Sequence, residues 1–237
     1  HLGLRVSAII EFHQHSMTPE QQELLAIQGL KTRFVLRGER VIDAVDGVDL
    51  EVAEDEIVGL VGESGSGKTV LGLSILRLVP HPGQIVGGRV LWRGRDVFSL
   101  SSSELRAFRG HSVAMIFQNA QASLNPVYPV GAQVASVLRL KRGLARDAAR
   151  REALRLLDLV RIPDAPHRYA DHAHQLSGGL CQRVMIAMAL ACQPSLLIAD
   201  EPTSALDVTI QDQILGLLAD LRQEFRMSIL LISHDLG

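Results

Sequence analysis

A glycine-rich segment in the first third of the chain has the composition of a loop that binds phosphate groups. Residues 62–69 read Gly-Glu-Ser-Gly-Ser-Gly-Lys-Thr, after a strand expected at 57–61 and before a helix expected at 69–78. Glycines let backbone N–H groups turn inward around phosphate oxygens, and the following helix N-terminus adds a favourable dipole. In such a loop Lys68 reaches the β- and γ-phosphates, and the Thr69 hydroxyl ligates Mg²⁺. We therefore expect a bound nucleotide with Mg²⁺, the nucleotide being held by Gly62, Glu63, Ser64, Gly65, Ser66, Gly67, Lys68 and Thr69.

Two adjacent carboxylates end a later apolar strand, expected at 196–199. Asp200 and Glu201 would lie at the carboxyl edge of a parallel sheet, where ligands of α/β proteins bind. There Asp200 is expected to hold Mg²⁺, and Glu201 to polarise the attacking water as a general base. Taken alone, the pair fits equally well a helix N-cap aspartate followed by a solvated glutamate. The phosphate loop earlier in the chain favours the first interpretation.

Two polar residues follow the other predicted buried strands. Gln118 comes after the strand 113–117, and His234 comes after the strand 228–233. We expect Gln118 to contact Mg²⁺ or the attacking water, and His234 to hydrogen-bond the γ-phosphate. A lone glutamine or histidine is usually an ordinary surface residue, and only the order in the chain favours function here. The predicted catalytic residues are thus Glu201, His234, Gln118 and Lys68, and the predicted metal ligands are Thr69, Gln118 and Asp200.

A second possible anion site opens the helix that runs from Ser177 through Arg183 to Leu190. Its first residues are Ser177, Gly178 and Gly179, which offer a hydroxyl and bare N–H groups. The phosphate loop already supplies an anion site in the same subunit. A second one makes sense if it closes over the nucleotide of a partner subunit. The alternative is an ordinary helix N-cap.

The remaining pattern predicts an α/β fold. Alternation of apolar and polar residues at 25–36 and 41–52 predicts an antiparallel β layer, and a further strand is expected at 87–94. Buried strands alternating with helices predict a parallel sheet. Residues 119–190 are expected to form an inserted helical subdomain, with one helix at 147–160, and another helix is predicted at 210–225.

Bulk properties restrict the function classes. The chain has 237 residues, a net charge of −2 and only two cysteines, Cys181 and Cys192. There is no basic excess that would point to nucleic acid, and the cysteines suggest a reducing compartment. Residues 1–25 are expected to be an N-terminal extension, non-native up to residue 16, before one domain at 26–237.

The motifs occur in the order found in the nucleotide-binding subunits of ABC transporters, which the chain strongly resembles. They are Gly62–Thr69, Gln118, Leu176–Arg183, Leu196–Glu201, Ser204–Asp207 and His234. The resemblance implies a P-loop NTPase with a RecA-like parallel sheet, an antiparallel β subdomain and an inserted helical subdomain. It also implies a head-to-tail dimer with two ATP molecules at the interface. Asp207 is expected to contact nucleotide there, together with Ser177, Gly178 and Gly179.

A narrower resemblance is to the oligopeptide, dipeptide and nickel importers, specifically to the first of their two paired ATPases. It rests on Gly62–Lys68, Ser123–Pro126, Gln182–Leu190 and Ala205–Thr209. It implies a second ATPase subunit, two permeases docked on the helical region after Gln118, and an extracytoplasmic binding protein. The expected location is peripheral, at the cytoplasmic face of the inner membrane, with no nucleic acid partner. The alternative is a non-transport ABC ATPase that acts on nucleic acid or the ribosome.

Some positions depart from the family pattern. Cys181 stands where these importers usually carry arginine, and Asp55 stands where glycine usually precedes Glu56. The sequence has no clear aromatic residue to stack on adenine. Phe34 is one candidate, but the position where the family pattern places the aromatic residue is occupied by Val41-Ile42. The family continues beyond the point where this chain stops, so a C-terminal truncation is expected.

Overall fold

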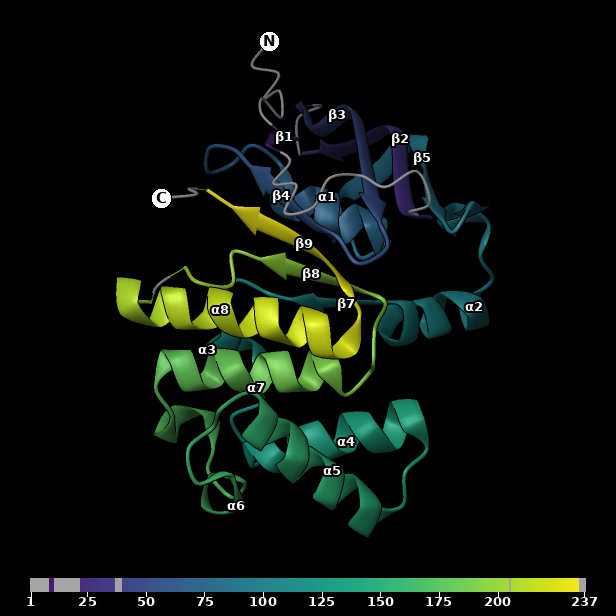
Figure 1. The fold of residues 1–237 in the computed structure, drawn as a ribbon. Helices are drawn as coiled ribbons and strands as arrows, with labels where there is room; N and C mark the ends of the chain where they lie inside the picture. Colours follow the sequence, from purple (N-terminus) through teal and green to yellow (C-terminus); the bar gives the residue numbers. More distant parts are fainter. Residues whose placement is uncertain (1–8, 11–21, 37–39, 205, 235–237) are drawn as a thin grey trace. The chain divides into compact units, whose positions relative to one another are not determined.

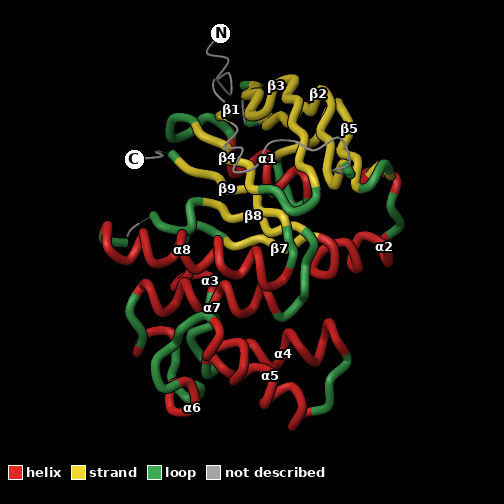
Figure 2. The backbone as a smooth tube through the Cα atoms, in the orientation of Figure 1, coloured by secondary structure: helices red, strands yellow, loops and turns green. Residues whose placement is uncertain are grey.

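The computed structural model describes residues 9–10, 22–36, 40–204 and 206–234. The chain divides into two compact units (Figures 1 and 2). The first consists of the chain up to Arg109 together with the segment from Met227 onward, and the second is Gly110–Arg226. Within the described residues no helix is long and apolar enough to cross a membrane.

The first unit contains the predicted antiparallel layer. Strand β2 (Glu23–Val35) lies between β3 (Val41–Ala53) and β5 (Gly83–Trp92), and β6 (Arg95–Asp96) pairs with β5. Leu24, Leu25, Ile27 and Leu30 of β2 are almost completely buried, and because the first two are adjacent, both faces of this part of the strand are covered. The antiparallel prediction is confirmed, although β5 begins four residues before the expected start at Gly87.

Parallel strands of the first unit hold the phosphate loop. Strand β4 (Ile57–Val61) pairs in parallel with β9 (Ser228–Ser233), and β1 (Ile9–Ile10) pairs antiparallel with β4. Helix α1 (Lys68–Ile75) follows β4 after the loop. The register places Val61 opposite Ser233, so the loop and His234 both leave the sheet at the same edge.

Helix α1 ends earlier than the prolines Pro80 and Pro82 predict. Arg77 adopts a left-handed conformation with φ of 52°. Its N–H donates to Ser74 O at 3.0 Å, and Leu78 N–H donates to Leu73 O at 2.8 Å, which is a Schellman ending. Arg109 completes the ending by donating to the carbonyls of Leu76 and Arg77, at 2.7 and 2.6 Å. The helix is therefore stopped by its own C-terminal motif, and the expected boundary at residue 78 is wrong.

Short helical segments complete the first unit and lead into the second. They are η1 (Val97–Ser99), α2 (Ser102–Ala107) and the π-helix η2 (Phe108–Ser112). A capping box fixes the start of α2, since Ser101 Oγ accepts from Glu104 N and Glu104 Oε2 accepts from Ser101 N.

The second unit contains two parallel strands and most of the helices. Strand β7 (Val113–Ile116) pairs in parallel with β8 (Leu196–Asp200). Strand β7 is one residue shorter than the expected strand at 113–117. Helices α7 (Gly178–Leu190) and α8 (Val208–Phe225) run side by side (Figures 1 and 2). The other helical segments are α3 (Ala120–Ser123), α4 (Val130–Arg142), α5 (Arg146–Leu159), α6 (Ala165–Arg168) and η3 (Ala173–Gln175).

A buried arginine connects three of these helices. Arg183 of α7 is 7% exposed, and its guanidinium donates to Val160 O at the end of α5 and to Gln213 Oε1 of α8, both at 3.0 Å. A buried cation is stable only when its donors are satisfied. The two contacts therefore fix α7 against the end of α5 and against α8.

Substitution of Gly88 tests how closely β5 approaches β2. We expect Gly88→Ala to lower the free energy of unfolding by about 2 kcal/mol more than Gly94→Ala does. Both glycines have positive φ, 83° and 77°, so both alanines carry the left-handed strain. A Cβ at Gly88 would lie 2.4 Å from Gly29 O, whereas at Gly94 nothing lies within 4 Å. Urea denaturation of both variants measures the difference, and equal losses would contradict the close approach.

Candidate functional site

The phosphate loop closes around the head group of its own lysine. Lys68 Nζ donates to Gly62 O at 2.6 Å and to Glu63 O at 2.8 Å, and lies 3.4 Å from Ser66 Oγ. Lys68 is only 4% exposed, so these oxygens supply the polar partners that a buried ammonium needs. Phosphate oxygens can take over this role when an anionic ligand enters the loop.

The main chain of the loop lies directly against β3. Gly67 has φ of 93°, and a Cβ there would be 2.0 Å from Ala44 O. Only glycine fits this position. The carbonyl of Gly67 accepts the first helical bond of α1 from Leu71 N at 2.9 Å. Thr69 is exposed on the first turn of α1, and the other predicted residues of the phosphate loop, 62–68, immediately precede it.

The second unit brings Gln118 and Glu201 into contact. Gln118 Nε2 donates to Glu201 Oε2 at 2.5 Å. The register explains the contact, because Ile116 pairs with Ala199 and both side chains come two residues after that pair. Glu201 has φ of 44°, and Ser204 Oγ donates to its carbonyl at 3.0 Å. The half-buried carboxylate of Glu201 therefore lies just beyond the carboxyl end of β8, where it can accept a proton.

The other predicted catalytic and metal-binding residues divide between the two units. Asp200 is 1% exposed at the end of β8, next to Glu201 in the second unit. His234 is exposed and directly follows β9, in the same unit as Lys68 and Thr69. Hydroxyl, amide and carboxylate oxygens, as in Thr69, Gln118 and Asp200, are the donor types that Mg²⁺ prefers.

Ser177 and Asp207 cap two helices that begin side by side. Ser177 Oγ accepts from Leu180 N at 3.3 Å, and Asp207 Oδ1 accepts from Ile210 N at 3.0 Å. Gly179 is buried against α8, where a Cβ would lie 2.8 Å from Ile210 Cγ2. Ser177, Gly178 and Asp207 are exposed. Two helix N-termini, each with a positive partial charge, thus open on one surface, as an anion site requires.

The departures from the family pattern have local structural explanations. Asp55 has φ of 55°, a left-handed conformation that aspartate tolerates better than most residues. Cys181 is fully buried, with Sγ 3.4 Å from Ala173 O, and burial raises the pKa of its thiol. The two candidate positions for adenine stacking differ in exposure. The Phe34 ring packs on Gly83, where a Cβ would lie 2.6 Å from Phe34 Cε1, whereas the Val41 side chain is 48% exposed.

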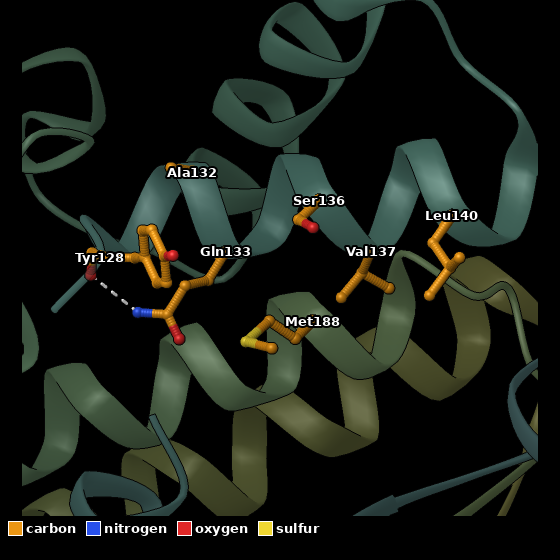
Figure 3. A pocket seen from close by; sticks show the side chains of 7 residues that line it. All are labelled: Tyr128, Ala132, Gln133, Ser136, Val137, Leu140 and Met188. Carbon is orange, nitrogen blue, oxygen red and sulfur yellow. Dashed lines mark hydrogen bonds between the residues drawn. The ribbon is translucent and has the colours of Figure 1, made fainter. Parts of the chain in front are cut away.

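Sequence reasoning missed an apolar cavity of about 310 Å³ between α4, α7 and the loop before α4 (Figure 3). The amide of Gln133 fixes this loop: it donates to the carbonyls of Asn125 and Tyr128 and accepts from Asn125 N, each at 2.9 Å. Tyr128 and Leu140 remain 59% and 80% exposed. Spacing along α4 is the signal that could have revealed the cavity. Its lining residues are Tyr128, Ala132, Gln133, Ser136, Val137, Leu140 and Met188.

Comparison with known proteins identifies the family. Residues 45–204 match the family model described as ABC transporter. The chain belongs to this family. The motifs from Gly62 to Glu201 fall within the matched stretch, Ser204–Asp207 begins at its last residue, and His234 lies beyond it.

Named relatives of this ABC cassette are import ATP-binding proteins. A Brucella abortus (strain 2308) protein named as a peptide import ATP-binding protein is 52% identical over 214 residues, which is 90% of this chain and 64% of that protein. The glutathione import ATP-binding protein GsiA of Pectobacterium atrosepticum is 50% identical over 227 residues, 93% of this chain and 36% of GsiA. The chain therefore spans less than two thirds of the length of these relatives.

A solved structure has the same cassette fold. It is the dimeric, post-hydrolysis state of the ATP-binding cassette MJ0796 bound to ADP and Pi. Its TM-score is 0.79 at 30% identity, and the match covers 90% of this chain and 89% of MJ0796. The predicted fold class, a mixed α/β P-loop ATPase with antiparallel and parallel strands, is confirmed by this match.

The cap of α8 can be separated from the charge of Asp207. We expect Asp207→Ala to lower the free energy of unfolding by about 1 kcal/mol, because Ile210 N loses its acceptor. Asp207→Asn keeps a capping oxygen without the charge and is expected to stay close to the parent. Thermal denaturation of the two variants compares them, and equal destabilisation would show that the charge matters more than the cap.

The two thiols should be unreactive in the folded chain. Cys181 and Cys192 are buried, and burial raises both pKa values, so the thiolate fraction at neutral pH falls below that of an exposed cysteine. We expect iodoacetamide to alkylate neither residue without denaturant and both in urea, as measured by mass spectrometry. Rapid native alkylation of Cys181 would mean that the start of α7 opens readily.

Proposed function

We propose that the chain binds and hydrolyses ATP with Mg²⁺ as the nucleotide-binding subunit of an ABC importer. The observation that carries the proposal is the contact between Gln118 and Glu201 at the end of β8, in a chain with a phosphate loop closed on Lys68. A carboxylate held in this way, in a member of the ABC family, is suited to act as the general base for water.

Each predicted residue has a role in this proposal. Residues 62–69 hold the phosphates, with Lys68 moving from its carbonyl partners to the β- and γ-phosphates. Thr69, Gln118 and Asp200 would hold Mg²⁺, which would neutralise charge on the phosphates. Glu201 accepts the proton of the attacking water, and His234 contacts the γ-phosphate.

Hydrolysis further requires a second cassette arranged head to tail. The paired helix N-termini, with Ser177, Gly178, Gly179 and Asp207, would contact ATP bound by that partner subunit. The paired caps and the exposure of Ser177 and Asp207 support this role, because a single subunit already has its own phosphate loop. The MJ0796 relative, described as dimeric and bound to ADP and Pi, supports it as well.

The names of the relatives favour a peptide as the transported solute. Relatives at about 50% identity are named for peptide or glutathione import, so we assign oligopeptides, dipeptides or a related small solute such as nickel. Two permeases would dock on the helical region, with the apolar cavity of Figure 3 as their contact. An extracytoplasmic binding protein would deliver the solute, and the subunit would lie peripherally at the cytoplasmic face of the inner membrane.

The domain boundaries of the proposal follow the motifs. The proposed nucleotide-binding domain covers residues 26–237, with a helical subdomain at about 119–190, although β2 begins at Glu23 and the proposed boundary therefore falls within this strand. We do not propose the alternative role on nucleic acid or the ribosome, because the named relatives are import proteins.

ATP hydrolysis by Glu201→Gln tests the proposal. We expect the rate to fall at least about a hundredfold because the general base is lost, while ATP binding persists and an ATP-bound dimer accumulates in light scattering. Glu51→Gln, an exposed carboxylate on β3, serves as the matched control and should hydrolyse ATP at the parental rate. Parental hydrolysis by Glu201→Gln would refute the assigned base.

The parent chain needs its own measurement. ATP binding with neither hydrolysis nor a dimer would mean that the partner cassette or the permeases must be present. Failure to bind ATP at all would refute the proposal at its first step.

A further inference from the structure

One short stretch of the second unit concentrates positive charge. Residues 139–155 hold seven of the 24 lysine and arginine side chains and two of the 26 carboxylates. The stretch therefore carries +5, and the remaining 220 residues together carry −7. Such a local excess within an acidic chain indicates an anionic partner for this surface.

Part of this charge surrounds an open cavity of about 370 Å³. Ala148, Arg151, Glu152 and Arg155 follow one another at helical spacing on α5 and form one wall. Arg142, the last residue of α4, and Leu144 of the connecting loop complete the lining. Helices α4 and α5 pack closely through fully buried residues such as Leu138, Ala149, Ala153 and Leu156, so the two walls are held at a fixed separation.

A single carboxylate orients two of the three arginines. Glu152 Oε1 accepts from Arg142 Nη1 at 3.1 Å and from Arg155 Nη2 at 3.0 Å, and Glu152 Oε2 accepts from Arg155 Nε at 3.0 Å. Hydrogen bonds from Arg155 and Arg142 lower the pKa of Glu152 against the opposing effect of burial, so this carboxyl is ionised at neutral pH. The pair of contacts presents the remaining guanidinium N–H groups in a defined geometry.

The third arginine has no partner of this kind. Among the residues that the structure describes, Arg151 makes no hydrogen bond or ion pair, and it is exposed at the cavity. Three guanidinium groups and one carboxylate leave the cavity with a net charge of +2. The concave surface, the two arginines oriented by Glu152 and the free N–H groups of Arg151 together form a set of donors around one cavity.

We propose that this cavity between α4 and α5 binds the phosphate group of an anionic ligand, with Arg142, Arg151 and Arg155 as the donors. Guanidinium groups match phosphate because their planar N–H pairs fit two oxygens at once, and the charge of a phosphate dianion balances the +2 of the cavity. The site belongs to the second unit, whereas the phosphate loop belongs to the first. The inference therefore does not rest on the proposed function.

A titration with inorganic phosphate, followed by amide chemical shifts, separates this site from the phosphate loop. We expect saturable shifts at residues 142–155, and about tenfold weaker binding at these residues in Arg151→Gln, because a charge-assisted hydrogen bond is lost. Arg146→Gln is the matched control: it removes the same charge from the exposed start of α5, outside the cavity lining. The control should bind phosphate within about twofold of the parent.

Vesicle flotation distinguishes the two sources of the phosphate group. Binding to phosphatidylcholine vesicles that contain phosphatidylglycerol, lost in Arg151→Gln and kept in Arg146→Gln, would identify a lipid head group. Saturable phosphate shifts without vesicle binding would identify a free phosphate compound. Absence of saturable shifts at 142–155 together with absence of Arg151-dependent vesicle binding would overturn the proposal. Equal losses in the two variants would also overturn it, since they would show diffuse attraction to charge.

Discussion

The buried ammonium group of Lys68 constrains the phosphate loop and the elements that meet it in the first unit. A cation removed from water must be surrounded by oxygen atoms, and here the carbonyls of Gly62 and Glu63 point inward to meet it. Those carbonyls can do so only if the main chain turns sharply through Gly67, which brings it against Ala44 of β3. The position of β3, the shape of the loop and the first residue of α1 are therefore set together. A phosphate that replaces the carbonyls as partner of Lys68 enters a loop that already has its shape.

In the second unit the corresponding constraint is strand register. Because β7 and β8 pair in parallel with Ile116 opposite Ala199, the first polar residues beyond them meet, and Gln118 hydrogen-bonds Glu201. A shift of one residue would turn the carboxylate to the opposite face. Arg183 adds a second constraint on the helices, since its guanidinium binds Gln213 of α8 and the carbonyl of Val160 at the end of α5.

The sequence predicted those features that depend on local pattern. Continuous apolar runs bounded by glycine or acidic residues marked β4, β8 and β9 within one residue. Features set by distant partners were missed. The Schellman ending of α1 is completed by Arg109, more than thirty residues away, which binds the carbonyl of Leu76. The spacing along α4 could indicate one wall of the cavity of Figure 3, but the other wall includes Met188 of α7, which is distant in the sequence.

The two departures from the importer pattern, Asp55 and Cys181, lie at positions where the local structure accommodates the side chain that is present. Asp55 lies in the turn between β3 and β4 in a left-handed conformation, and aspartate is among the few residues that adopt it at small cost. The turn is also braced by Glu56 Oε2, which accepts from Ala53 N at 2.7 Å, so β4 keeps its register with β9. Cys181 is small enough to lie fully buried beneath Ala173 O, and the cap between Ser177 and Leu180 persists one turn before it. Neither substitution therefore reaches the groups that would contact nucleotide: the loop geometry follows from Lys68 and Gly67, and the carboxylate geometry follows from the pairing of β7 with β8.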